Sequence, residues 1–374
     1  MQILRLLSVS VFVALLGVLV IGGCASSRDQ KLRSAYRAAA QWLVKNQRNE
    51  GSFIYFYDPK TAQISHESNT VRQLLASQGL ARAAKYFNDK ELLEAHRKNL
   101  KYLLSLIVSS DNFKLVKGDH GAPYVNASAF AVMTLIDSPD RDKYRTLIEQ
   151  LGAFLLHMQD ENGHINFYYP KGLDVMMDEG RQFNSQKFAS GESALACIYL
   201  YRYLKEPAYL ECARRAFSYY YPLIQQNRNS SYASWHGIAY AQLYALEPKP
   251  KYLQAINELA DILIVNQNTL DNPNFKPGGF DQERTWYTSA EAVFTEALGY
   301  AYRSNKAAGN SPELIEKYQQ ANLLGLNQLV ARQYPLEDSQ LLAGGIACED
   351  EVPRIYVDNN GHALMAFEEY FSRP

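Results

Sequence analysis

The sequence predicts an all-α protein, an (α/α)6 toroid of six helical hairpins with its long loops on one face. Apolar residues recur at helical spacing over nearly the whole chain, and strand signals are scarce. A second kind of helix, rich in Ala and Gly, opens six times, near residues 67, 126, 190, 234, 288 and 359. Short and long connections alternate, so the helices should form an inner and an outer ring. An open superhelical solenoid is the alternative, although six repeats without distinct capping repeats favour closure.

The N-terminal segment, residues 1–23, is predicted to direct targeting and to lie outside the fold. Arg5 precedes an apolar run from Leu6 to Val20, and small residues then lead to Cys24. This pattern resembles the lipobox of a bacterial lipoprotein signal, which implies that the segment is removed and that Cys24 is the lipidation site. No aspartate follows the cysteine, so the resemblance implies an outer-membrane lipoprotein that faces the periplasm. An uncleaved, inner-membrane anchor is the alternative.

The soluble body is predicted to be one domain, residues 31–374, joined to the lipid by a tether over residues 24–30. Its composition, 47% hydrophobic, is ample for a large core. A net charge of −1 gives no electrostatic footprint for nucleic acid. No Cys/His cluster has metal-ligand spacing, so neither a metal nor a cofactor is expected. Cys197 and Cys212 should lie level across a helical hairpin, either as a disulfide or as two buried thiols.

Amphipathic helices are expected to form the outer ring, each with one apolar face turned inward. Representative segments cover residues 32–43, 144–158 and 252–263, with apolar residues at i, i+4 and i+7 or i+8. Four segments end in a glutamine that is followed by a glycine, in a repeat that continues to the C-terminal part of the chain: Gln47 and Gly51, Gln159 and Gly163, Gln267 and Gly278, Gln333 and Gly344.

The Ala- and Gly-rich helices are expected to form the inner ring, because small side chains allow close packing. The connections that follow them are short, as at Asn88 and Pro248, whereas the connections that lead into them are long. All six long loops should therefore gather at the N-termini of the inner helices. Loops of this length in a compact domain are usually functional, so this face is predicted to hold the site.

The repeat and the number of hairpins resemble the α/α-toroid superfamily over about residues 31 to 373. The Gln-x-x-x-Gly endings look like the repeat of terpene cyclases and protein prenyltransferases. The six hairpins and aromatic loops look more like six-hairpin glycosidases, N-acylglucosamine 2-epimerases and toroidal polysaccharide lyases. An Asp-x-Asp-Asp motif is absent, and His236 lacks the partnering cysteine of a zinc site. The resemblance thus implies carbohydrate chemistry, with an isoprenoid cyclase as an outside alternative.

Candidate catalytic residues lie at the predicted openings of the inner helices: His66, Glu67, Arg72, Glu192, His236 and Asp358. The first three fall within two turns. There an imidazole or a carboxylate could transfer a proton, and a guanidinium could bind a substrate carboxylate. The structural alternative is helix capping, which explains the glutamate but requires neither His66 nor Arg72. Histidines are candidate bases because an unperturbed imidazole titrates near neutrality.

Candidate sugar-binding residues occupy the same openings and the adjoining loops: Asn69, Tyr124, Asn126, Trp235, Trp286, Tyr287 and His362. The pair Trp286-Tyr287 offers flat apolar faces with polar handles, which suit stacking on a sugar ring; anchoring of the loop is the alternative. Glu291, three residues after Thr288, matches a capping box instead.

Two kinds of chemistry fit these residues. A glycoside hydrolase needs two carboxylates, and those available are Glu67, Glu192, Glu291 and Asp358. A lyase or epimerase needs a base and groups that stabilise an enolate, and those available are His66, Asn69, Arg72 and Tyr124. We therefore expect a membrane-anchored lipoprotein that acts on a bacterial glycan, with the glycan and the lipid bilayer as its partners. A non-catalytic lipoprotein that binds a glycan or a peptide is the alternative, and the oligomeric state stays open.

Overall fold

The computed structural model of the chain describes residues 27–110, 113–118, 123–173, 179–269, 277–280, 287–348 and 353–372. The predicted signal segment and Cys24 lie outside the described residues. Residues 27–30, expected in the tether, already belong to the first helix, which is described over residues 27–45. No helix in the described part of the chain is long and apolar enough to cross a membrane.

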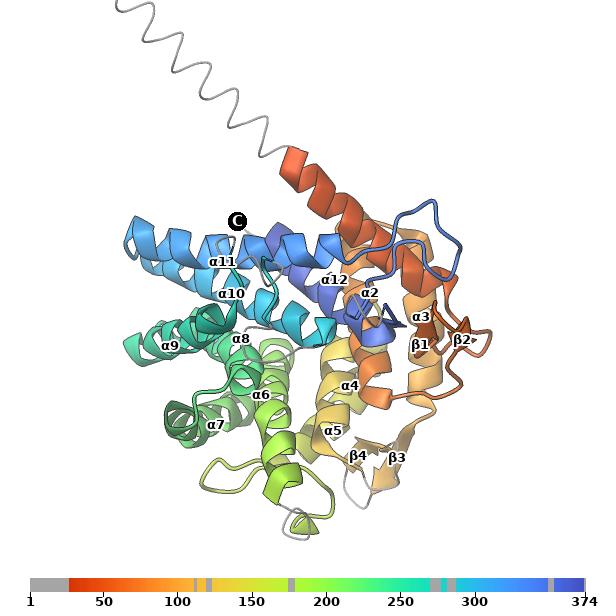
Figure 1. Ribbon diagram of the computed structural model, residues 1–374. Coiled ribbons are helices and arrows are strands. Elements are labelled where there is room, and N and C mark those ends of the chain that lie inside the picture. Colours follow the sequence, from red (N-terminus) through yellow and green to blue (C-terminus); the bar gives the residue numbers. More distant parts are fainter. Residues whose placement is uncertain are drawn as a thin grey trace, which may run out of the picture.

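Twelve α-helices of the described residues form two concentric rings (Figure 1). The inner ring consists of α2 (Thr70–Phe87), α4 (Val125–Asp137), α6 (Glu179–Leu204), α8 (Ser230–Leu246), α10 (Thr288–Ala308) and α12 (Val357–Phe371). The outer ring consists of the helix over 27–45, α3 (Lys90–Leu104), α5 (Arg145–Met158), α7 (Pro207–Gln226), α9 (Pro250–Asn266) and α11 (Pro312–Ala331). A 3-10 turn, η1 (Arg141–Tyr144), precedes α5.

The inner ring is closed, because each inner helix packs on the next and α12 packs on α2. This confirms the predicted (α/α)6 toroid and excludes the open solenoid. Glycines bring neighbouring inner helices together. A Cβ on Gly191 of α6 would lie 2.7 Å from the Cβ of Trp235 on α8, and one on Gly361 of α12 would lie 3.0 Å from the Cα of Ala76 on α2. Small side chains at these positions therefore set the distance between the inner helices.

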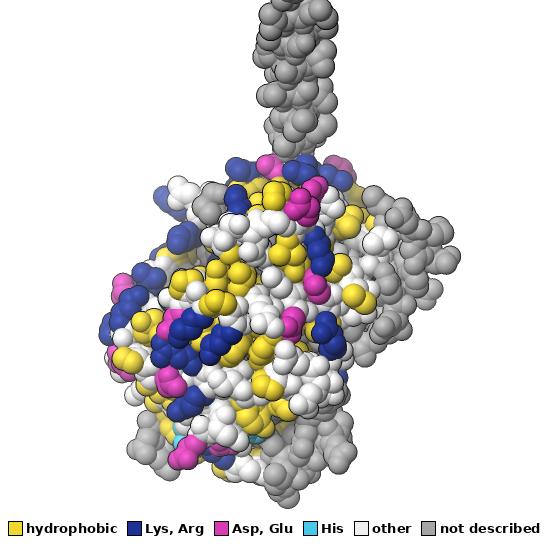
Figure 2. All heavy atoms as spheres, turned by 90° about the vertical axis from the view of Figure 1, so that its left-hand side faces the viewer, with side chains coloured by type: hydrophobic (Ala, Val, Ile, Leu, Met, Phe, Trp, Pro, Cys, Tyr) yellow, Lys and Arg dark blue, Asp and Glu magenta, His cyan; other side chains and the backbone are white. Residues whose placement is uncertain are grey.

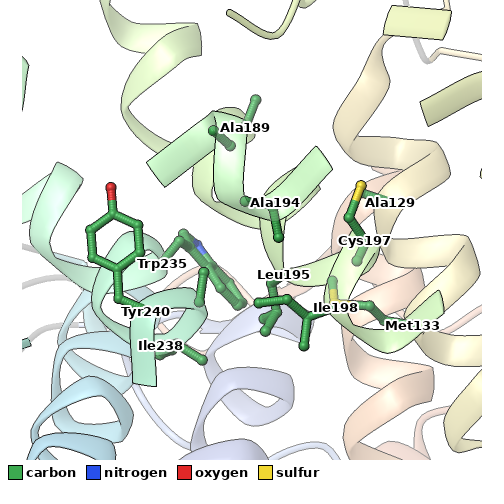
Figure 3. Packing of buried hydrophobic residues seen from close by; sticks show 14 of the residues in the cluster. Ala129, Met133, Ala189, Ala194, Leu195, Cys197, Ile198, Trp235, Ile238 and Tyr240 are labelled. Atoms are coloured by element: carbon green, nitrogen blue, oxygen red, sulfur yellow. The ribbon is translucent and has the colours of Figure 1, made fainter. Parts of the chain in front are cut away.

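Between the inner helices, aliphatic side chains interdigitate in the manner expected of a close-packed core. Figure 3 shows Trp235 pointing from α8 toward Leu195 on α6, with Met133 of α4 and Ile198 of α6 beside them. All four side chains are at least 96% buried. Such a core orients the inner helices rigidly, and with them the side chains at both ends of the ring.

The glutamine–glycine repeat of the sequence is a structural device that joins neighbouring outer helices. In each of its four copies the glutamine side chain donates one hydrogen bond to the glycine carbonyl and one to a carbonyl of a neighbouring outer helix. The glycine has a positive φ, and a Cβ there would lie within 2.6 Å of a carbonyl oxygen of that same helix. The last copy, Gln333 and Gly344, contacts Ala35 and Ala38 of the first helix and so closes the outer ring.

Short strands connect the first and last long loops. Strands β2 (Gln63–Ile64), β1 (Phe56–Asp58) and β5 (Ile355–Tyr356) form one antiparallel sheet in that order, with Phe56 opposite Tyr356. A hairpin of β3 (Ile107–Ser110) and β4 (Phe113–Val116) lies in the second long loop. The first sheet fixes the loop that leads into α2 against the loop that leads into α12.

Two sequence predictions about the inner helices are wrong. The connection between α7 and α8 is three residues long, 227–229, so five of the six hairpins have a long loop. Helices α6 and α8 also begin before residues 190 and 234. The side chain of Asn229 accepts a hydrogen bond from the Ser231 N–H and starts α8 there. As a result Glu192 and His236 lie inside helices and not at helix openings.

The predicted pairing of cysteines across a hairpin is confirmed in position. Cys197 on α6 and Cys212 on α7 are buried free thiols whose sulfur atoms lie 2.7 Å apart. Cys348 is buried as well. The structure thus contains the thiol alternative of the two that the sequence allows.

Candidate active site

Arg72 and Asp358 form an ion pair at the end of the inner ring where the inner helices begin, which we call the long-loop mouth. Arg72 lies in the first turn of α2, where the side chain of Asn69 accepts the Arg72 N–H. Asp358 lies in the first turn of α12. The Arg72 Nε is 3.1 Å from Asp358 Oδ2, and the carboxylate is almost fully buried whereas the guanidinium is about one-third exposed. The pair therefore presents its cation to solvent.

Two tyrosines hold the guanidinium: Tyr55, directly before β1, and Tyr356 of β5. Arg72 donates a hydrogen bond of 2.6 Å to the Tyr55 hydroxyl, and its guanidinium lies 5.3 Å from the Tyr55 ring and 5.7 Å from the Tyr356 ring. The two rings meet edge to face, with centroids 5.8 Å apart. The two tyrosines come from loops far apart in the sequence, and the pairing of β1 with β5 brings residues 55 and 356 together.

Burial sets the protonation of the Asp358 carboxyl. It raises the pKa of Asp358, while the positive charge of Arg72 lowers that pKa and so opposes the shift. Oδ1 of Asp358 is buried and has no hydrogen-bond partner among the described residues. An unpartnered carboxylate oxygen in such a place is costly unless a ligand or water reaches it.

Glu192 is the second buried carboxyl group of this mouth. It lies on α6 with its side chain almost wholly buried, and its Oε2 has no partner within the described part of the chain. Burial raises its pKa to about 8, and the side chain of Asn126 on α4 lowers that pKa slightly. Glu192 is therefore largely protonated at neutral pH and is able to donate a proton.

Trp235, His362 and Phe130 form an aromatic cluster at the centre of the ring. The Trp235 ring lies 5.8 Å from the His362 imidazole and 5.5 Å from the Phe130 ring. These three residues come from α8, α12 and α4, which are not neighbours in the ring, so their side chains meet across its axis. Burial and the charge of Arg72 lower the pKa of His362 to about 3, so this imidazole is neutral.

Two of the predicted catalytic residues lie at the edge of the mouth. His66 and Glu67 are exposed, and the Glu67 N–H donates to the Ser65 hydroxyl. Asn69 is used as the N-cap of α2. Their exposure leaves His66 and Glu67 available to a ligand, but no contact with the described residues orients their side chains toward Asp358.

His236 has the surroundings of a core residue. Its Nε2 lies 3.1 Å from the Ser190 Oγ and its Nδ1 lies 3.0 Å from the Tyr232 carbonyl oxygen, so both ring nitrogens are bonded. Burial lowers the pKa of His236 to about 4. This geometry favours a role in joining α6 to α8.

Aromatic residues are spread along the rim. Tyr124 stacks on Phe167 at 5.7 Å, and residues 124 and 168 form an isolated β-bridge, so the second and third long loops support each other. Tyr287, directly before α10, is 62% exposed. The predicted partner Trp286 lies outside the described residues. Rim aromatics of this kind could stack on a sugar ring.

Glu291 has the structural role that the sequence indicated, but with different partners. Its Oε2 lies 2.9 Å from an Arg332 guanidinium nitrogen, and its Oε1 accepts the Phe280 N–H. Both side chains of the ion pair are more than 90% buried. Glu291 thus fixes the loop before α10 and does not form the predicted capping box.

The candidate site therefore contains one largely protonated carboxyl group, Glu192 on α6, and one carboxyl group paired with arginine, Asp358 on α12. Burial raises the pKa of both carboxyl groups, and of the two only Asp358 has an arginine charge that opposes the shift. No group of three metal-ligating side chains occurs within the residues that the structure describes. The arrangement is suited to proton transfer to and from a bound ligand.

Comparison with known proteins identifies the fold of the chain but no family. No family model matches the chain, and no curated protein matches it by sequence. The structure is similar to a cellobiose 2-epimerase from Bacillus thermoamylovorans, with a TM-score of 0.68 and 12% identity over 92% of this chain and 100% of that one. It is also similar to an α-1,6-mannanase of Salegentibacter sp., with a TM-score of 0.65 and 9% identity over 92% of this chain and 100% of that one. An unsaturated glucuronyl hydrolase specific for heparin is similar too, with a TM-score of 0.64 and 11% identity over 91% of this chain and 97% of that one. At these identities the likeness establishes the six-hairpin toroid fold that the sequence predicted.

Proposed function

We propose that the protein is a glycan-processing enzyme whose active site is the long-loop mouth, and that its reaction is glycoside hydrolysis. The observation that carries this proposal is the pair of buried carboxyl groups in contrasting environments. Glu192, with a pKa of about 8, would protonate the leaving oxygen of the glycosidic bond. Asp358, held by Arg72, would act from the other side as base or nucleophile.

The alternative reactions are less well supported by the same geometry. An epimerase or lyase needs a base strong enough to remove a proton from carbon. The imidazole of His362 has a pKa of about 3 and is too weak a base for this, and both nitrogens of His236 are bonded. Asn69 is used in helix capping, and the Tyr124 ring stacks on Phe167. Hydrolysis is the reaction that the buried groups of the mouth serve best, whereas a base for the other reactions would have to be the exposed His66.

The fold neighbours support a carbohydrate substrate in general terms. They include a hydrolase, a mannanase and an epimerase, and a mannanase variant was solved with bound mannotriose. Each of these proteins is built on the toroid that this chain shares. The likeness is one of fold, so the argument for chemistry in this chain depends on Glu192 and Asp358.

The proposal is tested by incubating the purified full chain, in detergent, with a panel of bacterial envelope and capsular glycans. Hydrolysis adds the mass of one water for each bond broken, which mass spectrometry detects. We expect products with wild type and losses of at least about 1000-fold in kcat with Glu192→Gln and with Asp358→Asn, because each removes a proton-transferring group. Glu211→Gln, on the outer helix α7, is the matched control.

Three outcomes would contradict hydrolysis. Products of unchanged total mass with unsaturated ends would indicate elimination. Products of unchanged mass with an inverted hydroxyl, read by proton NMR, would indicate epimerisation. Saturable binding without any product, tolerant of Glu192→Gln, would indicate the non-catalytic lipoprotein.

We also propose that the protein is anchored to the outer membrane through a lipid on Cys24. The support is the sequence pattern before Cys24 and the start of the folded body within a few residues after it. Metabolic labelling with an alkyne palmitate analogue should label wild type and the control Ser26→Ala, but not Cys24→Ala. Equal labelling of all three would contradict the proposal.

A further inference from the structure

A large cavity lies at the opposite end of the inner ring from the long-loop mouth. Its volume is about 1380 Å³, and all six inner helices line it with residues of their C-terminal halves. Trp235, Phe130 and His362, which meet on the ring axis, are not among the lining residues. We call this opening the short-connection mouth. Its volume exceeds the roughly 300–1000 Å³ typical of small-ligand sites, in a fold whose core is otherwise well packed.

Basic side chains outnumber acidic ones around this cavity. The lining contains three acidic residues, Asp137, Asp142 and Glu368, and six basic residues, Arg82, Lys85, Arg141, Arg202, Arg303 and Lys306. Figure 2 views the side of the molecule on which the α10–α11 connection lies, and it shows Lys and Arg side chains gathered among hydrophobic ones. The potential in the cavity therefore favours anions.

Arg82 is neutralised and belongs to the structure of the cavity wall. Its guanidinium lies 2.7 Å from Asp137 Oδ2 and 3.3 Å from Glu368 Oε2, and it also donates to the Tyr199 hydroxyl. These partners satisfy its charge inside the ring. Arg82 is therefore not the group that would attract a ligand.

Arg202 differs, because no described carboxylate pairs with it. Its guanidinium donates to the side-chain and backbone oxygens of Gln242 only. Burial lowers its pKa, and the neighbouring charge of Arg303 lowers it further. Arg303 itself has one carboxylate partner, Glu369, at 2.9 Å, and packs on the Tyr300 ring at 4.5 Å. Both arginines line the cavity, and an anion would supply the counter-charge that Arg202 lacks among the described residues.

Tyrosine rings are the second group of side chains that lines the cavity. Five of them line it, and they present flat apolar faces with hydroxyl groups: Tyr86, Tyr199, Tyr244, Tyr300 and Tyr302. Such faces stack on sugar rings, while the planar fork of arginine matches a carboxylate or a sulfate.

We infer that the short-connection mouth is a binding site for an acidic saccharide, with Arg202 as the residue that binds the anionic group and Arg303 beside it. The tyrosines contact the rings of the ligand, and the cavity has room for several sugar units. This site is separate from the long-loop mouth, and the inference does not depend on the hydrolysis proposed there.

The competing explanation is that the basic residues only offset the negative ends of the six inner helices. Arg202, Lys85 and Lys306 do lie in the last turns of their helices. That explanation requires neither the cavity nor the tyrosines that line it. It also predicts that Arg202→Gln destabilises the fold and that no anionic sugar binds.

Titration calorimetry on the full chain in detergent tests the inference, with a tetragalacturonate as the acidic probe and maltotetraose as the neutral one. We expect the acidic probe to bind with an affinity that falls as salt rises, and the neutral probe to bind at least about tenfold more weakly. Arg202→Gln should lower the affinity for the acidic probe by at least about tenfold. Arg145→Gln, which removes an exposed arginine outside the cavity, should leave its affinity unchanged.

Hydrogen–deuterium exchange on the wild-type protein provides a readout that does not depend on the folding of a variant. The acidic probe should protect the C-terminal turns of α6 and α10, where Arg202 and Arg303 lie. Absence of binding overturns the inference, as does protection confined to the first turns of α2 and α12 together with lost binding in Arg72→Gln. Inorganic sulfate that binds as tightly as the tetragalacturonate would overturn the assignment to a saccharide.

Discussion

At the residue scale, burial determines which acidic side chains can perform proton chemistry. Glu67 and Glu192 are both glutamates near the long-loop mouth, but one is exposed and the other is almost wholly buried. Burial is what raises the pKa of the Glu192 carboxyl to about 8. The sequence contains both residues and cannot distinguish them, because burial depends on which helix turn faces the ring.

Replacement of Glu192 by Gln should change how stability depends on pH. In the native state Glu192 keeps its proton up to pH about 8, whereas in the unfolded chain it loses it near pH 4.5. Wild type therefore loses unfolding free energy as pH rises through this window, by about 1.4 kcal/mol per pH unit for one such group. The Glu192→Gln variant lacks that loss. Its free energy of unfolding relative to wild type should therefore rise between pH 5 and pH 8, by roughly a few kcal/mol.

Denaturant unfolding at pH 5, 6, 7 and 8 measures this difference. Glu67→Gln, which removes an exposed glutamate of the same mouth, is the control and should run parallel to wild type. Glu296 has a similarly raised pKa of about 8 and is retained in every variant, so its contribution cancels. A constant offset between Glu192→Gln and wild type at all four pH values would refute the assignment.

At the element scale, the glutamine–glycine repeat positions the outer helices. The same two residues solve the same geometric problem four times: the glycine adopts a positive φ that turns the chain back, and the glutamine amide donates to two carbonyls. The pattern was visible in the sequence as spacing. The spacing did not reveal what the repeat does. The second carbonyl that the glutamine binds belongs to a different helix, as in Gln47 with Ala95 and Gln159 with Cys212, about 50 residues further along the chain.

Gly163→Ala should destabilise the fold far more than Gly309→Ala. Both glycines have positive φ, +100° and +68°, so both substitutions strain the backbone by about 1–2 kcal/mol. A Cβ on Gly163 would in addition lie 2.3 Å from the Arg215 carbonyl oxygen of α7, whereas nothing lies within 4 Å of one on Gly309. We expect a further loss of about 2 kcal/mol or more for Gly163→Ala in denaturant unfolding. Equal losses in the two variants would show that the contact with α7 carries no energy.

At the scale of the whole molecule, closure of the ring depends on contacts between the ends of the chain. Gln333 binds the Ala35 carbonyl of the first helix, Trp42 donates to the Leu341 carbonyl, and β1 pairs with β5. Closure creates both mouths at once, since each is lined by residues from hairpins far apart in sequence. It also brings Arg72 to Asp358, 286 residues away along the chain.

Gln333→Ala should weaken the contact between the first helix and the C-terminal part of the chain, and this effect should be local. Two carbonyls would lose their donor, at a cost of about 1–3 kcal/mol. Amide exchange should rise in the helix over 27–45 more than in α6, on the other side of the ring. Gln320→Ala removes an exposed glutamine of α11, the helix that ends shortly before Gln333, and should leave the exchange of the first helix unchanged. Uniform acceleration in Gln333→Ala would mean that the ring opens as one cooperative unit.

The sequence by itself determined the helical class, the number of hairpins and the repeat that joins the outer helices, because helical periodicity and glycine requirements are local properties. It also named Arg72, Asn126, Glu192 and Asp358 as site residues. Only the tertiary structure decided which of these pair, that His236 is enclosed in the core, and that Tyr55 and Tyr356 hold the guanidinium. It also revealed the cavity at the short-connection mouth. Those outcomes depend on burial and on contacts between distant hairpins, and a linear pattern of residues contains neither.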